Sequence, residues 1–266
     1  MSQHLQLPDR YPVLGVGISE LAFDEAVSLF LCAAETRQKV RAVFCTVNTI
    51  VEAKRDTVLR SQIASSEIVA PDGMPLVWLG RLRGRKVDRV CGPDLMLALC
   101  ERSQAFGYRH FFYGGADGVA ERLVEELTGR FPGLQVAGTC TPPFRSLTNE
   151  EDNEVVADIN RARSDFVWVG LGSPKQDAWI ASHQSRLEAP VLLAVGAAFD
   201  FHCGNLVRAP RWMQHVGLEW LFRLAKEPRR LWRRYLVGNT LFGLYLLAEV
   251  LGFLLSRRVS HSGGGR

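Results

Sequence analysis

The stretch FVWVGLGSPKQDAWI, residues 166–180, begins as an apolar run and then breaks into a polar turn. Residues 166–169 are all apolar, which is typical of a strand covered on both faces of a parallel sheet. Gly170 and Gly172 allow the backbone to turn sharply where the strand ends. Pro174 predicts the first residue of a new helix, because its missing N–H costs nothing at that position. This order places the turn at the carboxyl end of a parallel strand, where open α/β sheets bind ligands.

The same alternation of short apolar runs and amphipathic stretches recurs through the first 205 residues. It predicts an α/β, Rossmann-like fold, a mostly parallel sheet with flanking helices. The pattern Thr148-x-x-Glu151 is a capping box and marks the start of one of the helices. We expect strands at 43–46, 68–70, 110–113, 136–139, 166–170 and 191–195, and helices at 23–36, 93–106, 118–130 and 149–161.

The bulk composition is that of one ordinary globular body with a small appendage. The chain has 266 residues, of which 47% are hydrophobic and 23% charged, enough to bury one sizeable core. The N-terminal residues have no apolar stretch that could act as a secretory signal. Its six cysteines form no CxxC pair, so we expect neither a zinc site nor a disulfide framework, and a reducing compartment.

The net charge of +4 hides an asymmetry between the two ends of the chain. From Arg208 onward there are 11 Lys/Arg against 3 Asp/Glu, which leaves 21 against 25 in the first 207 residues. Basic tails attract anionic partners such as nucleic acid, acidic lipid surfaces or phosphorylated substrates. We therefore divide the chain into a catalytic body at 1–205 and a basic helical appendage at 206–266.

The appendage contains an apolar segment, residues 236–255, whose single charged residue is Glu249. Twenty mostly apolar residues are long enough to cross a bilayer, although Asn239 and Thr240 are unfavourable in lipid. A helix lying in the membrane interface, with tryptophans at headgroup level and arginines on phosphates, fits equally well. A helix packed on the body is the third possibility. The sequence predicts membrane contact and leaves its geometry open.

Several common chemistries are not indicated by the sequence. It contains no complete GxGxxG, no GxxxxGK[ST] and no HExxH. No two aspartates stand at the D-x-D spacing at which many nucleotide-sugar enzymes hold a divalent metal. We therefore expect no metal and no cofactor. An anionic ligand would instead be met by arginines, lysines and backbone N–H groups.

A polar cluster follows each of several apolar runs. A single such cluster has an ordinary structural explanation, since Asp-Gly is a common turn and a lone aspartate often caps a helix. Their recurrence is more informative, because a parallel sheet brings the carboxyl ends of its strands to one rim. Such a rim suits a phosphate-bearing, hydroxyl-rich ligand. The clusters are Thr46-Val-Asn48, Asp72-Gly73, Arg89 to Asp94, Gly114-Gly115-Ala-Asp117, Gly172 to Gln176 and Asp200-Phe-His202.

These clusters, in this order, resemble the WecG/TagA/CpsF family of bacterial glycosyltransferases, family 26 of the sequence-based classification. The resemblance runs from about residue 13 to 238. Its most specific parts are GSPKQ and the block RAP…GLEW, followed by EPxR. It implies an inverting, metal-independent enzyme at the cytoplasmic face of the bacterial inner membrane. The donor would be a UDP-sugar and the acceptor a polyprenyl-diphosphate-linked saccharide, used for an exopolysaccharide or surface polysaccharide.

The resemblance also implies roles for individual residues. Asp72 falls on the proposed catalytic base, with Thr46 and Asn48 beside it. Arg89 and Gln176 fall on pocket positions, and Asp200 on a position associated with the nucleotide. Arg223, Arg230 and Arg233 match arginines thought to close over the active site on membrane contact. The Gly114-Gly115 turn belongs to the same rim, and we rank Gln176 above Lys175 for direct contact with sugar or phosphate.

The donor sugar stays open at this stage. Relatives use N-acetylmannosamine, its uronic acid or glucose, and we lean to glucose because no basic group is assigned to a sugar carboxylate. A non-catalytic, membrane-bound nucleotide-sugar-binding regulator is an alternative from another class. Nucleic acid is not expected as a partner, because binding it would not need the apolar run beside the arginines. His202 and Cys203 depart from the family pattern, and we expect them to be buried without a role.

Overall fold

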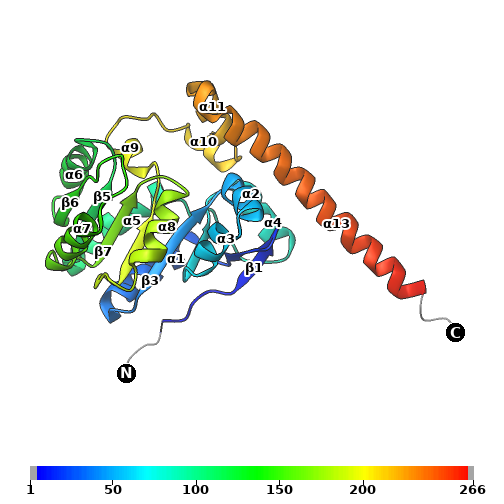
Figure 1. The fold of residues 1–266 in the computed structure, drawn as a ribbon, viewed down its shortest axis with the longest axis horizontal. Helices are drawn as coiled ribbons and strands as arrows, with labels where there is room; N and C mark the ends of the chain where they lie inside the picture. Colours follow the sequence, from blue (N-terminus) through cyan, green and yellow to red (C-terminus); the bar gives the residue numbers. More distant parts are fainter. Residues whose placement is uncertain (1–4, 263–266) are drawn as a thin grey trace.

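A parallel six-stranded sheet forms the centre of the protein, which a computed structural model describes for residues 5–262, with side chains to residue 252. The strand order is β4-β3-β8-β7-β5-β6, and each neighbouring pair is parallel. A separate antiparallel hairpin precedes it. The predicted α/β fold with a parallel sheet is confirmed (Figure 1). The strands are β1 (Arg10–Val13), β2 (Val16–Ser19), β3 (Val40–Cys45), β4 (Ile68–Pro71), β5 (Arg109–Gly114), β6 (Gln135–Cys140), β7 (Phe166–Gly170) and β8 (Val191–Ala194).

Helices cover both faces of the sheet. One core cluster joins the sheet to α1, α5, α6 and α9, and the other joins it to α2, α3, α4, α7, α8 and the hairpin. The helices of the body are α1 (Phe23–Thr36), α2 (Val47–Arg55), α3 (Thr57–Ala64), α4 (Met74–Leu82), α5 (Gly92–Ser103), the 3-10 turn η1 (Gln104–Phe106), α6 (Val119–Arg130), α7 (Asn149–Arg161), α8 (Lys175–His183) and α9 (Ala198–His202).

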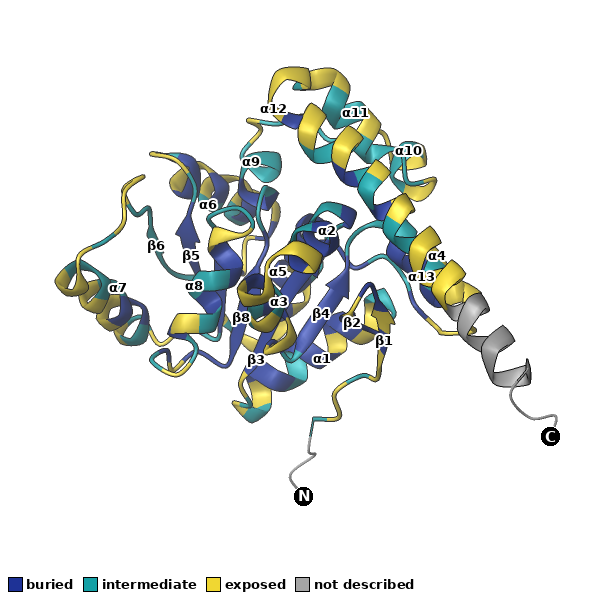
Figure 2. Cartoon of the chain, turned by 45° about the vertical axis from the view of Figure 1, so that its right-hand side comes forward, coloured by how far each residue is buried: buried dark blue, intermediate teal, exposed yellow. Residues whose placement is uncertain are grey.

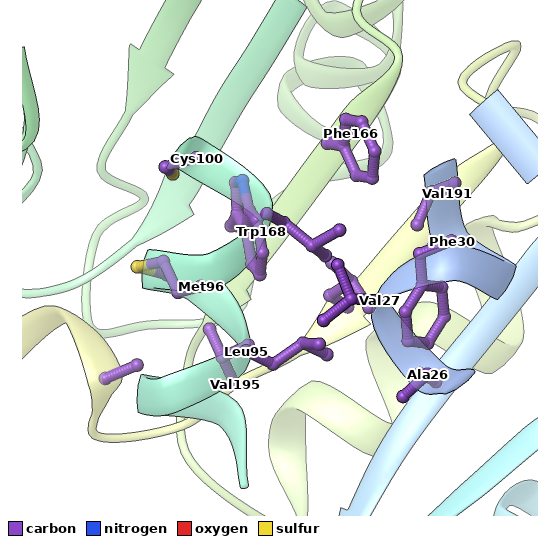
Figure 3. Close-up of a cluster of buried hydrophobic side chains, with 14 of the residues drawn as sticks. Ala26, Val27, Phe30, Leu95, Met96, Cys100, Phe166, Trp168, Val191 and Val195 are labelled. Carbon is purple, nitrogen blue, oxygen red and sulfur yellow. The ribbon is translucent and has the colours of Figure 1, made fainter. Parts of the chain in front are cut away.

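Strand β7 shows how the apolar runs serve both faces at once. Phe166 and Trp168 belong to the first core cluster, and Val167 and Val169 belong to the second. This alternation is the period-two geometry of a strand buried on both sides. In Figure 3, side chains of α1 and α5, among them Val27, lie over Phe166 and Trp168.

Several helices and strands of the body have the bounds that the sequence predicts. Helices 23–36 and 149–161 and strand 166–170 have the predicted bounds. The capping box is present, since Thr148 Oγ1 accepts from Glu151 N at 3.2 Å and Thr148 N donates to the Glu151 carboxylate at 2.8 Å. Pro174 differs by one residue, because it is the N-cap and α8 begins at Lys175.

Strand β3 begins at Val40, earlier than the predicted residue 43. The prediction began too late because a buried arginine, Arg41, interrupts the apolar run of the strand. Arg41 is only 6% exposed and its Nε lies 2.9 Å from Glu67 Oε2. Pairing of this kind offsets the cost of burying a charge, and it can be recognised only once the two residues are brought together.

The hairpin and the three short helices α2 to α4 were not predicted. Leu14 and Gly15 both have positive φ, 50° and 88°, as a two-residue hairpin turn requires. Thr46 Oγ1 caps α2 by accepting from Thr49 N at 3.3 Å. Asp56 caps α3 by accepting from Val58 N at 2.8 Å. These helices are too short for a clear 3.6-residue period, so for α2 and α3 the capping residues were the usable signal.

The last described elements form a helical appendage. They are α10 (Arg211–His215), α11 (Glu219–Lys226), α12 (Pro228–Trp232), the π-helical turn η2 (Arg233–Val237) and α13 (Gly238–Ser262). Helix α13 packs on the body near α2 through Phe242, and it then runs away from the body to the C-terminus (Figure 1). Much of its surface is exposed (Figure 2).

The apolar segment predicted at 236–255 lies within η2 and α13. Among the described residues, one helical stretch, Pro228–Gly252, is long and apolar enough to cross a bilayer. Only 11% of its most apolar window is buried, so it is not a core helix of the body. The side chains of residues 253–262, with the flanking Arg257 and Arg258, and the glycine-rich tail at 263–266 lie outside the described residues.

Candidate active site

The polar clusters lie along one rim of the sheet, as the parallel strand order requires. Thr46 directly follows β3, and Asp72 directly follows β4, its neighbour in the sheet. The Asp72 backbone N–H donates to the Cys45 carbonyl at 3.0 Å, which ties the two strand ends together. The Gly114-Gly115 pair lies at the end of β5, farther along the same rim, with Gly114 as the last residue of the strand.

A pocket of about 340 Å³ opens at the β3 and β4 end of this rim. Five of the predicted residues line it: Thr46, Asn48, Asp72, Arg89 and Arg223. The appendage forms its other side, so the pocket lies between the body and helices α10, α11 and α13. The remaining lining residues are Val47, Gly73, Met74, Pro75, Gln214, Gly217, Glu219, Trp220, Tyr235, Asn239, Phe242 and Gly243.

Arg89 holds Asp72 in the pocket. Its Nε donates to the Asp72 backbone carbonyl at 2.6 Å, and its Nη2 donates to Asp72 Oδ1 at 3.0 Å. Both side chains are 20% exposed, so the pair is largely withdrawn from water. This arrangement fixes the carboxylate and leaves Oδ2 without a hydrogen bond from Arg89.

Glu219 is a charged residue at the site that the sequence analysis did not single out. Its Oε2 lies 2.8 Å from Arg89 Nη2, and its Oε1 lies 3.4 Å from Arg208 Nε. Arg208 also forms an ion pair with Asp94, at the start of α5. One sequence signal could have identified it: Glu219 is an acidic residue in the apolar GLEW block of an otherwise basic appendage. The chain of charges joins the appendage to the body at Asp72.

The charge state of Asp72 reflects these neighbours. Burial raises the pKa of Asp72 above its ordinary value; Arg89 opposes the shift and the Glu219 carboxylate adds to it. For Arg89, burial works against the charged form, but Asp72, Cys91 and Glu219 more than offset it and its pKa is raised. A carboxylate with a raised pKa is a better proton acceptor at neutral pH than an ordinary one.

Other predicted residues lie along the rest of the rim, and within the described chain they do not line this pocket. Gln176 is only 4% exposed; its Nε2 donates to the Ala194 carbonyl at 2.8 Å, while Oε1 has no hydrogen-bond partner in the protein. Gly115 N donates to the Gly170 carbonyl at 3.1 Å. Asp200 Oδ1 accepts from Asn205 at 3.2 Å, and Lys175 is exposed.

The close approach at Gly114 has a specific cause. Its φ is +117°, and a Cβ there would lie 2.7 Å from the Gly170 carbonyl carbon. The ends of β5 and β7 therefore meet more closely than a side chain at this position permits. The roles predicted for this second half of the rim stay predictions.

The three appendage arginines do not share one environment. Arg223 lines the pocket, and its guanidinium carbon lies 5.3 Å from the centroid of the Phe201 ring. Arg230 forms an ion pair with Glu227, and Arg233 lies over the Trp232 ring. The structure thus places Arg223 in the same pocket as Asp72 and leaves Arg230 and Arg233 outside the pocket lining.

His202 and Cys203, for which the sequence analysis expected no functional role, do not line the pocket in the described chain. His202 is partly buried, and its Nε2 lies 2.9 Å from the Pro93 carbonyl. Cys203 is partly buried, and all six cysteines are free thiols.

Comparison with known proteins supports the family resemblance that the sequence motifs indicate. The sequence model described as "Glycosyl transferase WecG/TagA/CpsF family" matches residues 11–254. An N-acetylglucosaminyldiphosphoundecaprenol N-acetyl-beta-D-mannosaminyltransferase of Bacillus spizizenii (strain W23) is 30% identical over 226 residues, which cover 82% of this chain and 86% of that protein. A protein with the same name from Bacillus subtilis (strain 168) is 32% identical over 202 residues, 75% of this chain and 77% of its own length. The family match includes every rim cluster, the pocket and most of α13.

Proposed function

The chain belongs to the WecG/TagA/CpsF glycosyltransferase family, and on that basis we propose that it transfers N-acetylmannosamine from a UDP-sugar to polyprenyl-diphosphate-linked N-acetylglucosamine. The observation that carries the proposal is the pocket that Asp72, held by Arg89, shares with Arg223 of the appendage. It combines a partly buried carboxylate for a hydroxyl proton with a cation for a phosphate.

The comparisons favour this donor over the glucose suggested by the sequence analysis. Both relatives are named as N-acetylmannosaminyltransferases. The acceptor in their names, a diphosphoundecaprenol carrying N-acetylglucosamine, likewise supports a lipid-linked acceptor for this chain. N-acetylmannosamine was the alternative donor, and it now becomes the preferred one.

The proposed step is an inverting displacement. A hydroxyl oxygen of the acceptor sugar attacks the anomeric carbon of the donor, and its proton passes to Asp72. The bond from that carbon to the diphosphate breaks with both electrons going to the diphosphate oxygen. Arg223 lies in the same pocket and would stabilise the charge that develops on the leaving group.

We place the enzyme at the cytoplasmic face of the membrane through its appendage. Leu244 and Leu247 of α13 are each more than half exposed, and Trp212 of α10 is 62% exposed. Apolar surface of this kind beside arginines suits an anionic lipid surface. The α13 geometry allows either a crossing helix or one lying on the membrane.

A donor screen tests the proposal. Purified full-length protein would be given UDP-sugars one at a time with polyprenyl-diphospho-N-acetylglucosamine, and both UDP release and glycolipid product would be measured. We expect UDP-N-acetylmannosamine to give product at a rate far above UDP-glucose, and no product with the non-glycosylated lipid. A preference for UDP-glucose would instead favour glucose as the donor sugar, as the sequence analysis expected. Absence of product with every donor would contradict the proposed activity.

A further inference from the structure

The pocket beside Asp72 has a large apolar part, although a sugar and a diphosphate bind mainly through polar groups. Besides four charged side chains and four uncharged polar ones, six apolar or aromatic side chains line it. The charged ones are Asp72, Arg89, Glu219 and Arg223, and the uncharged polar ones are Thr46, Asn48, Gln214 and Asn239. The six apolar or aromatic side chains form the apolar wall and come from separate elements that converge here: Val47 of α2, Met74 and Pro75 of α4, Trp220 of α11, Tyr235 of η2 and Phe242 of α13. Hydroxyl-rich ligands are matched by hydrogen-bonding groups, so this wall indicates an apolar ligand part.

Helix α13 continues this wall outward. Asn239 and Gly243 line the pocket, and Leu247 and Val250 follow at intervals of four and three residues, which keeps them on one helix face. Leu247 is 55% exposed and Val250 is 54% exposed. Exposed apolar residues, Leu247 and Val250, therefore form an apolar track from the pocket along α13, the helix that leaves the body. Much of the surface of this helix is exposed (Figure 2).

Gly243 lies at the mouth of the pocket. It is exposed, it lines the pocket, and a Cβ built on it would meet no atom within 4 Å. A glycine in a helix interior costs stability relative to other residues. At this position the missing side chain leaves the passage between the pocket and the track open.

We propose that the apolar wall of the pocket binds the first isoprene units of the acceptor lipid, and that Gly243 leaves the opening through which the chain passes onto α13. The inference rests on the proposed function and names the subsite that recognises the lipid. The acceptor's sugar would then lie at Asp72, with the acceptor's own diphosphate between that sugar and the lipid subsite. The acceptor is recognised as a lipid by the pocket itself as well as by the membrane.

Soluble acceptors separate recognition in the pocket from membrane binding. N-acetylglucosamine diphosphates carrying one, two or three isoprene units would be compared without detergent or lipid, with UDP-N-acetylmannosamine as donor. We expect kcat/KM to rise roughly tenfold per unit, the scale for burying about two methylene groups. Equal kcat/KM for all three acceptors would overturn the inference while leaving the proposed transfer intact.

Two matched variants locate the effect. Gly243→Phe fills the mouth of the pocket, whereas Gly252→Phe adds the same ring to an exposed glycine of α13 that likewise meets no atom within 4 Å and does not line the pocket. We expect Gly243→Phe to raise KM for the three-unit acceptor about tenfold, since that burial is lost. KM for the one-unit acceptor and for the donor should stay unchanged, as should all values of Gly252→Phe.

Other outcomes are equally decisive. A raised donor KM in Gly243→Phe would assign the apolar wall to the nucleotide and overturn the inference. Identical kinetics in the two variants would do the same. If Gly243→Phe does not fold, as judged by its melting temperature, Gly243→Val carries the same comparison against Gly252→Val. Failure of the wild-type chain to transfer to any acceptor would instead contradict the proposed function.

Discussion

Glu219 Oε2 lies 2.8 Å from Arg89 Nη2, the same nitrogen that lies 3.0 Å from Asp72 Oδ1. One guanidinium is thus shared by a carboxylate of the body and a carboxylate of the appendage. The charge on Asp72 depends on where the appendage lies, because moving Glu219 away would remove a like charge and leave Arg89 to Asp72 alone.

We expect Glu219→Gln to move the acid limb of the kcat/KM profile to lower pH. Burial raises the pKa of Asp72, and the Glu219 charge raises it further, so an uncharged amide lowers it. A base must be deprotonated to act, and activity would then persist at more acidic pH. The control is Glu227→Gln, which removes an appendage carboxylate that pairs with Arg230. An unmoved acid limb in Glu219→Gln would contradict the assignment.

We expect Asp72→Asn to lower kcat by about 10²- to 10⁴-fold, the range associated with loss of a general base. Binding of the UDP-sugar should persist, since the amide keeps the shape of the side chain. The variant also tests the alternative of a non-catalytic regulator, because a regulator would keep its cellular function after this substitution. Asp88→Asn, which alters an exposed ion pair with Arg81, serves as the control.

Gly114→Ala should destabilise the fold far more than Gly107→Ala. Both glycines have positive φ, so both substitutions bear a backbone cost of about 1 kcal/mol. A Cβ at Gly107 meets nothing within 4 Å, whereas one at Gly114 would lie 2.7 Å from the Gly170 carbonyl carbon. Forcing these strand ends apart adds about 1–3 kcal/mol. Urea unfolding measures both, and equal free energies of unfolding would contradict the close approach.

Asp177→Asn should stabilise the protein at neutral pH and not at acidic pH. Burial raises the pKa of Asp177 to about 6, while its Oδ2 accepts from Ser173 Oγ at 2.7 Å. The unfolded chain has an ordinary aspartate, near 3.9. The wild type therefore has its full stability below about pH 4 and loses part of it as the pH rises through about 6. The amide has no such loss, so the variant gains about 3 kcal/mol at pH 7.5.

Thermal or urea unfolding at pH 4 and pH 7.5 checks this prediction. Asp158→Asn is the matched control, because that side chain is 61% exposed and belongs to a surface ion pair. A gain for Asp177→Asn that is the same at both pH values would show that ionisation is not its cause.

The parallel sheet and the polar rim were predictable from the amino-acid pattern alone. Strand 166–170 was predicted with its bounds because a strand buried on both faces has no polar residue to obscure it. Parallel pairing then obliges the residues after β3 and β4, Thr46 and Asp72, to lie at one edge. The short helices α2 to α4 escaped prediction, since eight or nine residues do not establish a period against a competing turn pattern.

The contribution of the appendage to the pocket could not be predicted without the folded structure. Glu219 and Arg89 lie far apart in the sequence, and nothing local distinguishes Arg223, which lines the pocket, from Arg230, which pairs with Glu227. Gln176 likewise turns its amide N–H inward to Ala194. Local sequence sets which way a chain turns, whereas an ion pair or a pocket wall depends on packing between distant segments, and that packing is a property of the whole fold.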